Sequence, residues 1–413
     1  MTGQFPTCRF CKTPLTQTLV DLGETPLAND YVSPDRLAQP DPRYPLHARV
    51  CSACKLVQVD AVTTPQAIFG HYAYFSSYSA SWIEHARRFC EMARTRFDLG
   101  DSSQVIEVAS NDGYLLKHFI AAGVPALGIE PAANVADAAV AAGVPTEVRF
   151  FGADAAMDLV SRGLAADLVI GNNVLAHVPD INDFVAGLAQ VLKPDGVVSV
   201  EFPHLANLIK EVQFDTIYHE HYCYLSLLAV ERIFKAHGLK VFDVEELATH
   251  GGSLRVLACR LSSSKHQEQA GLGKVRTEEA NMGLDRVDAY KGFEPKVQAA
   301  RTSLLAFLRK AKLDGQTVAA YGAAAKGNTL LNYCGVGTDL IDYVVDRNPH
   351  KQNHWLPGSR LPIHAPEQIF QTRPNFLLIL PWNLQAEIMS ETSAVREWGC
   401  RFVTAIPTTR ITA

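Results

Sequence analysis

Five consecutive residues carry a dense set of acid–base groups: Tyr218, His219, Glu220, His221 and Tyr222. A neutral imidazole is a base suited to physiological pH, and phenols can donate hydrogen bonds to a developing oxyanion. The cluster therefore fits the removal of a proton from a weak acid. Its histidines are two residues apart, so they do not form the HExxH zinc motif, whose histidines are four apart on a helix.

The alternative interpretation of this segment is an edge strand or turn whose polar rings make ordinary hydrogen bonds. In a strand, side-chain alternation would place Tyr218, Glu220 and Tyr222 on one side, and His219 and His221 on the other. The pattern gives His219 no role of its own.

A second motif follows a short β-rich run at residues 105–109. It consists of Glu107, then the turn residues Ser110, Asn111 and Gly113, and finally Glu130 at the end of the next predicted strand. Such a turn lets the backbone approach a cofactor, and an acid at the second strand end can accept hydrogen bonds from ribose hydroxyls. A dinucleotide-binding loop would carry GxGxxG, and this loop has a single glycine. The motif favours S-adenosylmethionine over a dinucleotide.

Three further residues follow later predicted strands. Asp154 is expected near the end of the third strand, where an adenine amine could be recognised. Asn173 and His177 follow the fourth strand at residues 167–170, and ligands of such sheets bind at the carboxyl ends of strands. We expect both to face the reactive end of the cofactor. For His177 the alternative is a histidine on a helix face that bonds to a carbonyl group.

Four of the nine cysteines form two CxxC pairs, Cys8 with Cys11 and Cys51 with Cys54. In a reducing compartment, paired CxxC motifs are typical of a tetrahedral zinc site with four thiolates. Four sulfurs leave no coordination position for water, so the predicted zinc is structural. The alternatives are a coincidental spacing or a redox dithiol.

The elements that position these residues alternate between strand and helix from residue 104 to about 200, and again from 317 to 380. This alternation predicts two α/β units with parallel sheets and helices on both faces. Residues 262–312 are expected to form connecting helices, broken near Gly271–Gly273. The predicted division is a zinc-binding domain at 1–70, a methyltransferase domain at 71–262, and linker helices with a second Rossmann-like domain at 263–413.

The second unit has a small-residue loop from Gly322 to Lys326 that ends a predicted strand and opens a helix. Backbone N–H groups at such a turn, together with a lysine, form an anion site. Arg347 and Asn348 follow the next predicted strand, so two cations are expected near a diphosphate. The alternative is a stabilising domain that binds no ligand.

Composition excludes several classes of protein. The net charge is −5 without a Lys/Arg-rich run, which argues against nucleic-acid or anionic-membrane partners, including a zinc-ribbon methyltransferase that acts on nucleic acid. The sequence contains no run of about 18 apolar residues, so no transmembrane helix is predicted. The first residues lack a secretory pattern, so a cytoplasmic location is expected. The sequence does not set the oligomeric state, and a monomer is compatible with it.

Six motifs in one order make the chain resemble a known family. They are the paired CxxC module, VIEVASNDGYLL, NNVLAHVPD, YHEHYCYLS, THGGSLRV and YGAAAKGNTLLNY. Together they resemble the S-adenosylmethionine-dependent sugar C-methyltransferases, which methylate a carbon of nucleotide-linked 4-keto-6-deoxy sugars. The resemblance implies a zinc-binding N-terminal domain, a central class I methyltransferase fold, and a C-terminal Rossmann-like domain that helps to hold the nucleotide sugar.

The same resemblance implies roles for individual residues. His221 falls on the base of the family, with Tyr218, Glu220, His177 and Tyr72 around the sugar. We expect Glu220 to orient His221, and the other three residues to donate to the enolate or to sugar hydroxyls.

The resemblance leaves the product open. Carbons 3 and 5 both flank a C4 ketone, and carbon 3 with a thymidine diphosphate substrate is the family expectation. An O- or N-methyltransferase acting on a sugar or small phenol is the main enzymatic alternative, although it needs only modest help from a base.

Overall fold

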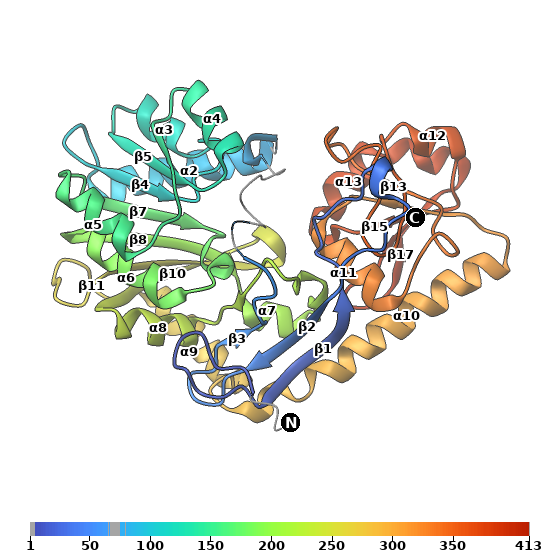
Figure 1. Cartoon of the computed structure of the whole chain (residues 1–413), viewed down its shortest axis with the longest axis horizontal. Coiled ribbons are helices and arrows are strands. Elements are labelled where there is room, and N and C mark those ends of the chain that lie inside the picture. Colours follow the sequence, from blue (N-terminus) through green and yellow to red (C-terminus); the bar gives the residue numbers. More distant parts are fainter. Residues whose placement is uncertain (1–4, 65, 67–74, 79, 413) are drawn as a thin grey trace.

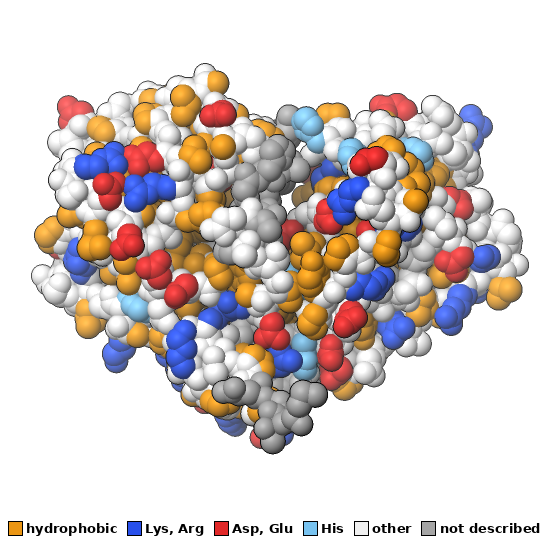
Figure 2. Space-filling model, viewed as in Figure 1, with side chains coloured by type: hydrophobic (Ala, Val, Ile, Leu, Met, Phe, Trp, Pro, Cys, Tyr) orange, Lys and Arg blue, Asp and Glu red, His pale blue; other side chains and the backbone are white. Residues whose placement is uncertain are grey.

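The computed structural model describes residues 5–64, 66, 75–78 and 80–412, and the strands of this part of the chain form three sheets. Two lobes, one around the seven-stranded sheet and one around the six-stranded sheet, stand above a small N-terminal sheet, and the long helix α10 runs beneath (Figure 1). In the space-filling view the surface is hollowed between the two lobes (Figure 2).

The seven-stranded sheet has the order β10-β11-β8-β7-β4-β5-β6, in which only β11 is antiparallel to its neighbours. Its strands are β4 (Val105–Val108), β5 (Ala126–Glu130), β6 (Thr146–Val148), β7 (Ala166–Asn172), β8 (Leu192–Pro203), β10 (Leu239–Leu247) and β11 (Ser253–Arg260). All four residues of β4 are buried, as expected for a strand covered on both faces. The strand order reverses between β4 and β7, and ligands of such sheets bind outside the carboxyl ends of the strands there.

Helices and short 3-10 turns precede, connect or follow these strands in the chain. They are η2 (Ser76–Tyr78), α2 (Ala80–Phe97), α3 (Leu116–Ala121), α4 (Ala133–Ala141), α5 (Ala153–Ser161), η3 (Leu175–His177), α6 (Ile181–Val191), α7 (Leu205–Lys210), η4 (Phe214–Thr216), α8 (Leu227–Ala236) and η5 (Thr249–Gly251). The α/β alternation predicted from the sequence is confirmed.

The N-terminal sheet is antiparallel and has the order β1-β2-β3-β9. Its strands are β1 (Gln17–Thr25), β2 (Tyr44–Val50), β3 (Val57–Gln58) and β9 (Cys223–Tyr224), with the turn η1 (Pro34–Arg36) between β1 and β2. The fourth strand therefore comes from the methyltransferase region. Of the two local structures considered for residues 218–222, the segment forms the turn and not the strand, because the bond from His221 N to Tyr218 O closes a turn before β9.

The connection to the C-terminal unit is helical, as predicted, but its break lies elsewhere. Helix α9 (Ala270–Met282) continues through Gly271 and Gly273 and ends at Gly283, whose left-handed backbone closes the helix. After the turn η6 (Val287–Tyr290), helix α10 (Phe293–Leu313) buries a stripe of apolar residues at intervals of three and four. This stripe joins one continuous core with the N-terminal sheet and the C-terminal sheet.

The C-terminal sheet has the order β14-β13-β12-β15-β16-β17, parallel except for β17. Its elements are β12 (Val318–Tyr321), α11 (Ala325–Cys334), β13 (Val344–Val345), β14 (Ile363–His364), α12 (Gln368–Thr372), β15 (Phe376–Ile379), η7 (Trp382–Leu384), α13 (Gln385–Glu391), η8 (Ser393–Trp398), β16 (Arg401–Thr404) and β17 (Arg410–Thr412). Strand β13 begins only at Val344, because the chain before it forms a turn in which the carbonyl of Gly337 accepts hydrogen bonds from the backbone of Leu340 and Ile341. None of the described helices combines the length and apolar character needed to cross a membrane.

Gly128 on β5 tests how closely the cofactor turn packs on the sheet. A Cβ atom there would lie 2.3 Å from Ser110 Oγ and 2.9 Å from Thr146 Oγ1. We expect Gly128→Ala to lower the free energy of unfolding by about 1–3 kcal/mol, because the turn must move. Gly273→Ala is the control, since its Cβ meets open space in α9 and should be neutral or stabilising by up to about 1 kcal/mol. Urea unfolding measures both, and equal effects would contradict the packing argument.

Candidate active site

The four predicted zinc ligands come together. The sulfur atoms of Cys8, Cys11, Cys51 and Cys54 all lie within 4.8 Å of one another, with Cys8 and Cys54 at 3.5 Å and Cys11 and Cys51 at 3.4 Å. Sulfur atoms on a tetrahedral zinc ion would be about 3.8 Å apart. The donor set fits zinc and fills its coordination sphere, so the zinc is structural.

The two CxxC turns share one backbone design. Lys12 N donates to Cys8 O, and Lys55 N donates to Cys51 O, with both lysines in the left-handed region (φ 62° and 66°). The second turn directly joins β2 to β3. Because β3 pairs with β9, the zinc site holds the strand that follows the YHEHY segment.

The cofactor turn is held by the acid at the end of β5. Glu130 accepts from the backbone N–H of Asn111 at 3.0 Å and of Ala132 at 2.9 Å. Burial raises the pKa of Glu130 despite these bonds. Burial also raises the pKa of Glu107, well above its usual range, with nearby carboxylates adding to the effect.

Several buried polar atoms at this edge have no partner among the described residues. They are Glu107 Oε2, Ser110 Oγ, Asn172 Oδ1 and Asn173 Oδ1. Unsatisfied buried polar groups are costly and require an explanation, and a polar ligand provides one. The edge fits the amino acid and ribose groups of S-adenosylmethionine. Asp154 lies in the first turn of α5 and is exposed.

His221 is held by a carbonyl group and a phenol. Its Nδ1 donates to Thr216 O at 3.0 Å, and its Nε2 lies 2.7 Å from the hydroxyl of Tyr218. A carbonyl oxygen can only accept, so Nδ1 carries the proton and Nε2 has the lone pair. Desolvation lowers the pKa of His221 well below its usual range, and His177 lowers it further. The ring is therefore a neutral base at physiological pH.

The prediction that Glu220 orients His221 is wrong. The carboxyl group of Glu220 accepts from Asn29 Nδ2 at 2.7 Å, and Thr216 O occupies the position at Nδ1 that was expected for it. Burial raises the pKa of Glu220 to about 7. The main chain of Glu220 also contributes to the site, because His177 Nδ1 donates to its carbonyl group at 2.9 Å.

His177 lies beside His221, as the sequence suggested. Their ring centroids are 4.6 Å apart with an angle of 73° between the planes. Desolvation lowers the pKa of His177 to about 4. The structure thus brings Tyr218, His177 and His221 together, with partial exposure of all three. Tyr72 lies outside the described residues.

The remaining residues of the segment anchor it to the N-terminal module. His219 Nε2 donates to Pro45 O at 3.3 Å, which gives this residue the structural role that the sequence left open. The guanidinium of Arg9 lies 5.0 Å from the centre of the Tyr222 ring. The backbone of Arg9 follows the zinc ligand Cys8 directly, so the metal site and the segment are in contact.

Sequence reasoning missed His250, although the THGGSLRV motif contains it. His250 has a left-handed backbone (φ 55°), and its Nε2 accepts from Asn173 Nδ2 at 3.3 Å. Desolvation lowers its pKa to about 4. Asn29 and Thr216 were also missed, because an amide or a main-chain carbonyl gives no chemical signal in a sequence.

The predicted diphosphate-binding residues of the C-terminal unit lie in different environments. Lys326 Nζ donates to Asn383 Oδ1 at 2.7 Å, and desolvation lowers its pKa. Arg347 is exposed, and its guanidinium is occupied by Glu391 at 2.6 Å and Glu387 at 3.1 Å. Asn348 caps a local turn by accepting from the backbone of His350.

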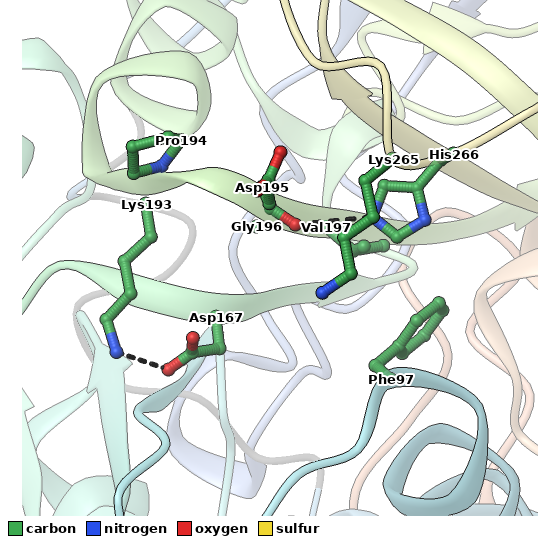
Figure 3. A pocket seen from close by; sticks show the side chains of 9 residues that line it. All are labelled: Phe97, Asp167, Lys193, Pro194, Asp195, Gly196, Val197, Lys265 and His266. Carbon is green, nitrogen blue, oxygen red and sulfur yellow. Dashed lines mark hydrogen bonds and ion pairs between the residues drawn. The ribbon is translucent and has the colours of Figure 1, made fainter.

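A cavity of about 270 Å³ lies at the opposite edge of the seven-stranded sheet, near the start of β7 (Figure 3). Lys193 pairs with Asp167 there at 2.6 Å, and His266 bonds to the backbone of Asp195. The cofactor residues follow the carboxyl ends of the strands, so this cavity is separate from the candidate site.

Comparison with known proteins agrees with this architecture. Family models match residues 8–69 as a zinc binding domain, 82–244 as a methyltransferase domain and 248–407 as a C-methyltransferase C-terminal domain. C-methyltransferase NovU of Streptomyces niveus is 36% identical over 404 residues, which cover 98% of this chain and 96% of that protein. The chain belongs to the C-methyltransferase family. It is an S-adenosylmethionine-dependent enzyme with a zinc-binding module.

Solved structures with a similar fold include magnesium protoporphyrin IX methyltransferase from Synechocystis PCC 6803 and the PH0226 protein from Pyrococcus horikoshii OT3. The first is 13% identical with a TM-score of 0.35, over 49% of this chain and 100% of that chain. The second is 13% identical with a TM-score of 0.36, over 47% of this chain and 97% of that chain. No functional conclusion rests on either.

Loss of one zinc ligand should release the metal and weaken the site. We expect Cys54→Ala to reduce bound zinc from about one per chain to near zero, because three thiolates no longer complete the tetrahedron. Methyl transfer should fall as well, since β3 and β9 lose their support. Elemental analysis and a methyl-transfer assay measure the two effects. Cys334→Ala removes a buried thiol in the C-terminal unit and should keep the zinc, so zinc retention by Cys54→Ala would contradict the assignment.

The buried Glu220 predicts a pH-dependent stability. Its carboxyl has a raised pKa in the folded chain, so its stabilising contribution is complete below about pH 4.5 and is lost as the pH rises through about 7. The Glu220→Gln variant keeps a neutral amide throughout. Relative to it, the wild type should lose roughly 3 kcal/mol of unfolding free energy between these pH values. Urea unfolding at several pH values measures this, and parallel curves would contradict a buried carboxyl.

Proposed function

We propose that the enzyme removes the C-3 proton of a nucleotide-linked 4-keto-6-deoxy sugar, with thymidine diphosphate as the nucleotide, and methylates that carbon. The product is a branched-chain sugar. The observation that carries this proposal is the neutral His221, whose Nδ1 donates to Thr216 O and whose Nε2 lone pair accepts from the hydroxyl of Tyr218.

Carbon methylation needs such a base. A carbon next to a ketone becomes a nucleophile only after it loses a proton, and the resulting enolate places negative charge on the ketone oxygen. His221 Nε2 takes the proton, and the Nδ1–H bond to Thr216 O stabilises the imidazolium that forms. Tyr218 releases Nε2 when substrate binds and donates its hydroxyl to the enolate oxygen. S-adenosylmethionine, held by the edge formed by Glu107, Asn111 and Glu130, supplies the methyl group.

The surroundings of the base suit this role. His177 has its Nδ1 proton bonded to Glu220 O, which makes its Nε2 a hydrogen-bond acceptor. Burial keeps both imidazoles neutral before proton transfer. The donors and the base act at close range in a poorly hydrated environment, where such interactions are strongest.

The C-terminal domain is proposed to hold the nucleotide diphosphate. Lys326 supports this role because its charge is close enough to lower the pKa of His221 and of His250, after desolvation. Asn348 and Arg347 remain proposed contacts. Arg347 must leave Glu387 and Glu391 to bind a phosphate, so Lys326 is the better candidate for the phosphate contact.

A C-5 methyltransferase acting on the same substrates is the alternative within this chemistry. The neutral histidine pair favours carbon over oxygen or nitrogen as the methyl acceptor, because the latter atoms need little help from a base. The second Rossmann-like domain likewise favours a nucleotide sugar over a small phenol.

Replacement of the base tests the proposal. We expect His221→Asn to lower methyl transfer by at least about a thousandfold and to abolish solvent deuterium exchange at the carbon next to the ketone, because the variant lacks the imidazole that takes the proton in this proposal. The substrates are nucleotide 4-keto-6-deoxy sugars with S-adenosylmethionine, and NMR locates both the deuterium and the new methyl carbon.

The matched control is His266→Asn, which changes a histidine of the separate cavity in Figure 3 and should keep full activity. Unchanged deuterium exchange in His221→Asn would remove His221 as the base. A methyl group found on oxygen or nitrogen would refute the C-methyl product.

A further inference from the structure

One hydrogen bond crosses from the C-terminal domain to the turn beneath the base. The indole Nε1 of Trp382, in η7, donates to Asp215 Oδ2 at 2.7 Å. Asp215 belongs to η4 and has 0% of its surface exposed. Burial raises its pKa to about 6, opposed by the charge of Lys326, so it is an anion at neutral pH. A hydrogen bond to a buried carboxylate is one of the stronger kinds.

The position of Asp215 in the chain gives this bond its importance. The next residue is Thr216, whose carbonyl accepts the proton of His221 Nδ1 at 3.0 Å. A shift of η4 therefore moves the group that fixes both the tautomer and the direction of the His221 ring. The cavity beside His221 and Thr216 is only about 10 Å³, so the turn has little room to rearrange.

Other residues of the C-terminal domain contact the same turn. Thr329 Oγ1 of α11 donates to Ile217 O at 3.1 Å, and the ring of Tyr333 packs edge-on against Phe214 at 5.3 Å. The turn is thus bounded by the C-terminal domain along its length. Among these contacts, only the indole bond reaches the residue directly before Thr216.

Trp382 also contacts two groups on the substrate side. Lys326 Nζ lies 4.6 Å from the centre of its ring. A Cβ atom on Gly251, the neighbour of His250, would lie 2.4 Å from the ring edge, so the indole rests directly on this backbone. The ring therefore links the proposed diphosphate cation, the His250 loop and the turn of the base.

We propose that Trp382 is a positioning residue for His221, which acts through Asp215 and the carbonyl of Thr216. The C-terminal domain then does more than hold the nucleotide, since its docking sets the orientation of the base. The inference rests on the proposed function, in which His221 removes the proton.

The test is Trp382→Phe, which keeps an aromatic ring against Gly251 and Lys326 but removes the N–H donor. We expect kcat to fall about tenfold, the effect of losing one hydrogen bond of about 1.4 kcal/mol, with KM for the nucleotide sugar changed less than about twofold. NMR of ¹⁵N-histidine-labelled enzyme without substrate should show shifted Nδ1 and Nε2 signals for His221. Asp215→Asn combined with Trp382→Phe should cost little more than either change alone.

Trp398→Phe is the matched control, because Trp398 makes the same kind of bond, to Pro374 O at 3.1 Å, in the same domain. It should leave kcat and the His221 signals unchanged. If Trp382→Phe kept the wild-type His221 signals or the wild-type kcat, the positioning role would be overturned. The same holds if the losses of kcat from Asp215→Asn and Trp382→Phe simply add in the double variant. The NMR result is independent of turnover, so it can hold even if His221→Asn keeps deuterium exchange, which would refute the proposed function alone.

Discussion

The active site depends on a short backbone pairing between distant parts of the chain. Val57 pairs with Tyr224 and Gln58 with Cys223, which makes a piece of the methyltransferase domain the fourth strand of the N-terminal sheet. Strand hydrogen bonds fix the direction of the chain as well as its position, so the preceding turn at residues 218–222 starts from a defined place. The second zinc turn immediately precedes β3. A structural metal site thus contributes to where His221 lies.

The chemistry of the site follows from burial more than from charge. His221 and His177 are kept neutral by desolvation, and Glu220 is half-protonated near neutral pH. Each of the two histidines donates its Nδ1 proton to a main-chain carbonyl, so Nε2 carries the lone pair in both rings. Carbonyl groups orient an imidazole without adding a full charge, and these two bonds raise the pKa values of the histidines by less than desolvation lowers them.

Local patterns predicted much of this molecule. The cysteine spacing, the acids at strand ends such as Glu130, and the two α/β units all follow from short-range signals. Predictions failed where partners lie far apart in sequence. Glu220 was expected to face His221, but Asn29 binds it from the N-terminal module, and the turn at Thr216 supplies the orienting group. Arg347 was expected to be available, but carboxylates on α13 occupy it. Tertiary contacts between distant residues produce no periodic pattern in the sequence from which they could be predicted.

The same pairing between β3 and β9 has a consequence for biosynthesis. On the ribosome, all four zinc ligands emerge within the first 54 residues, whereas β9 is made only when residues 223–224 appear. The two CxxC turns can bind metal early, but the edge of β3 must wait for most of the methyltransferase domain. An unpaired strand edge is a site of aggregation, and here it stays short, at two residues.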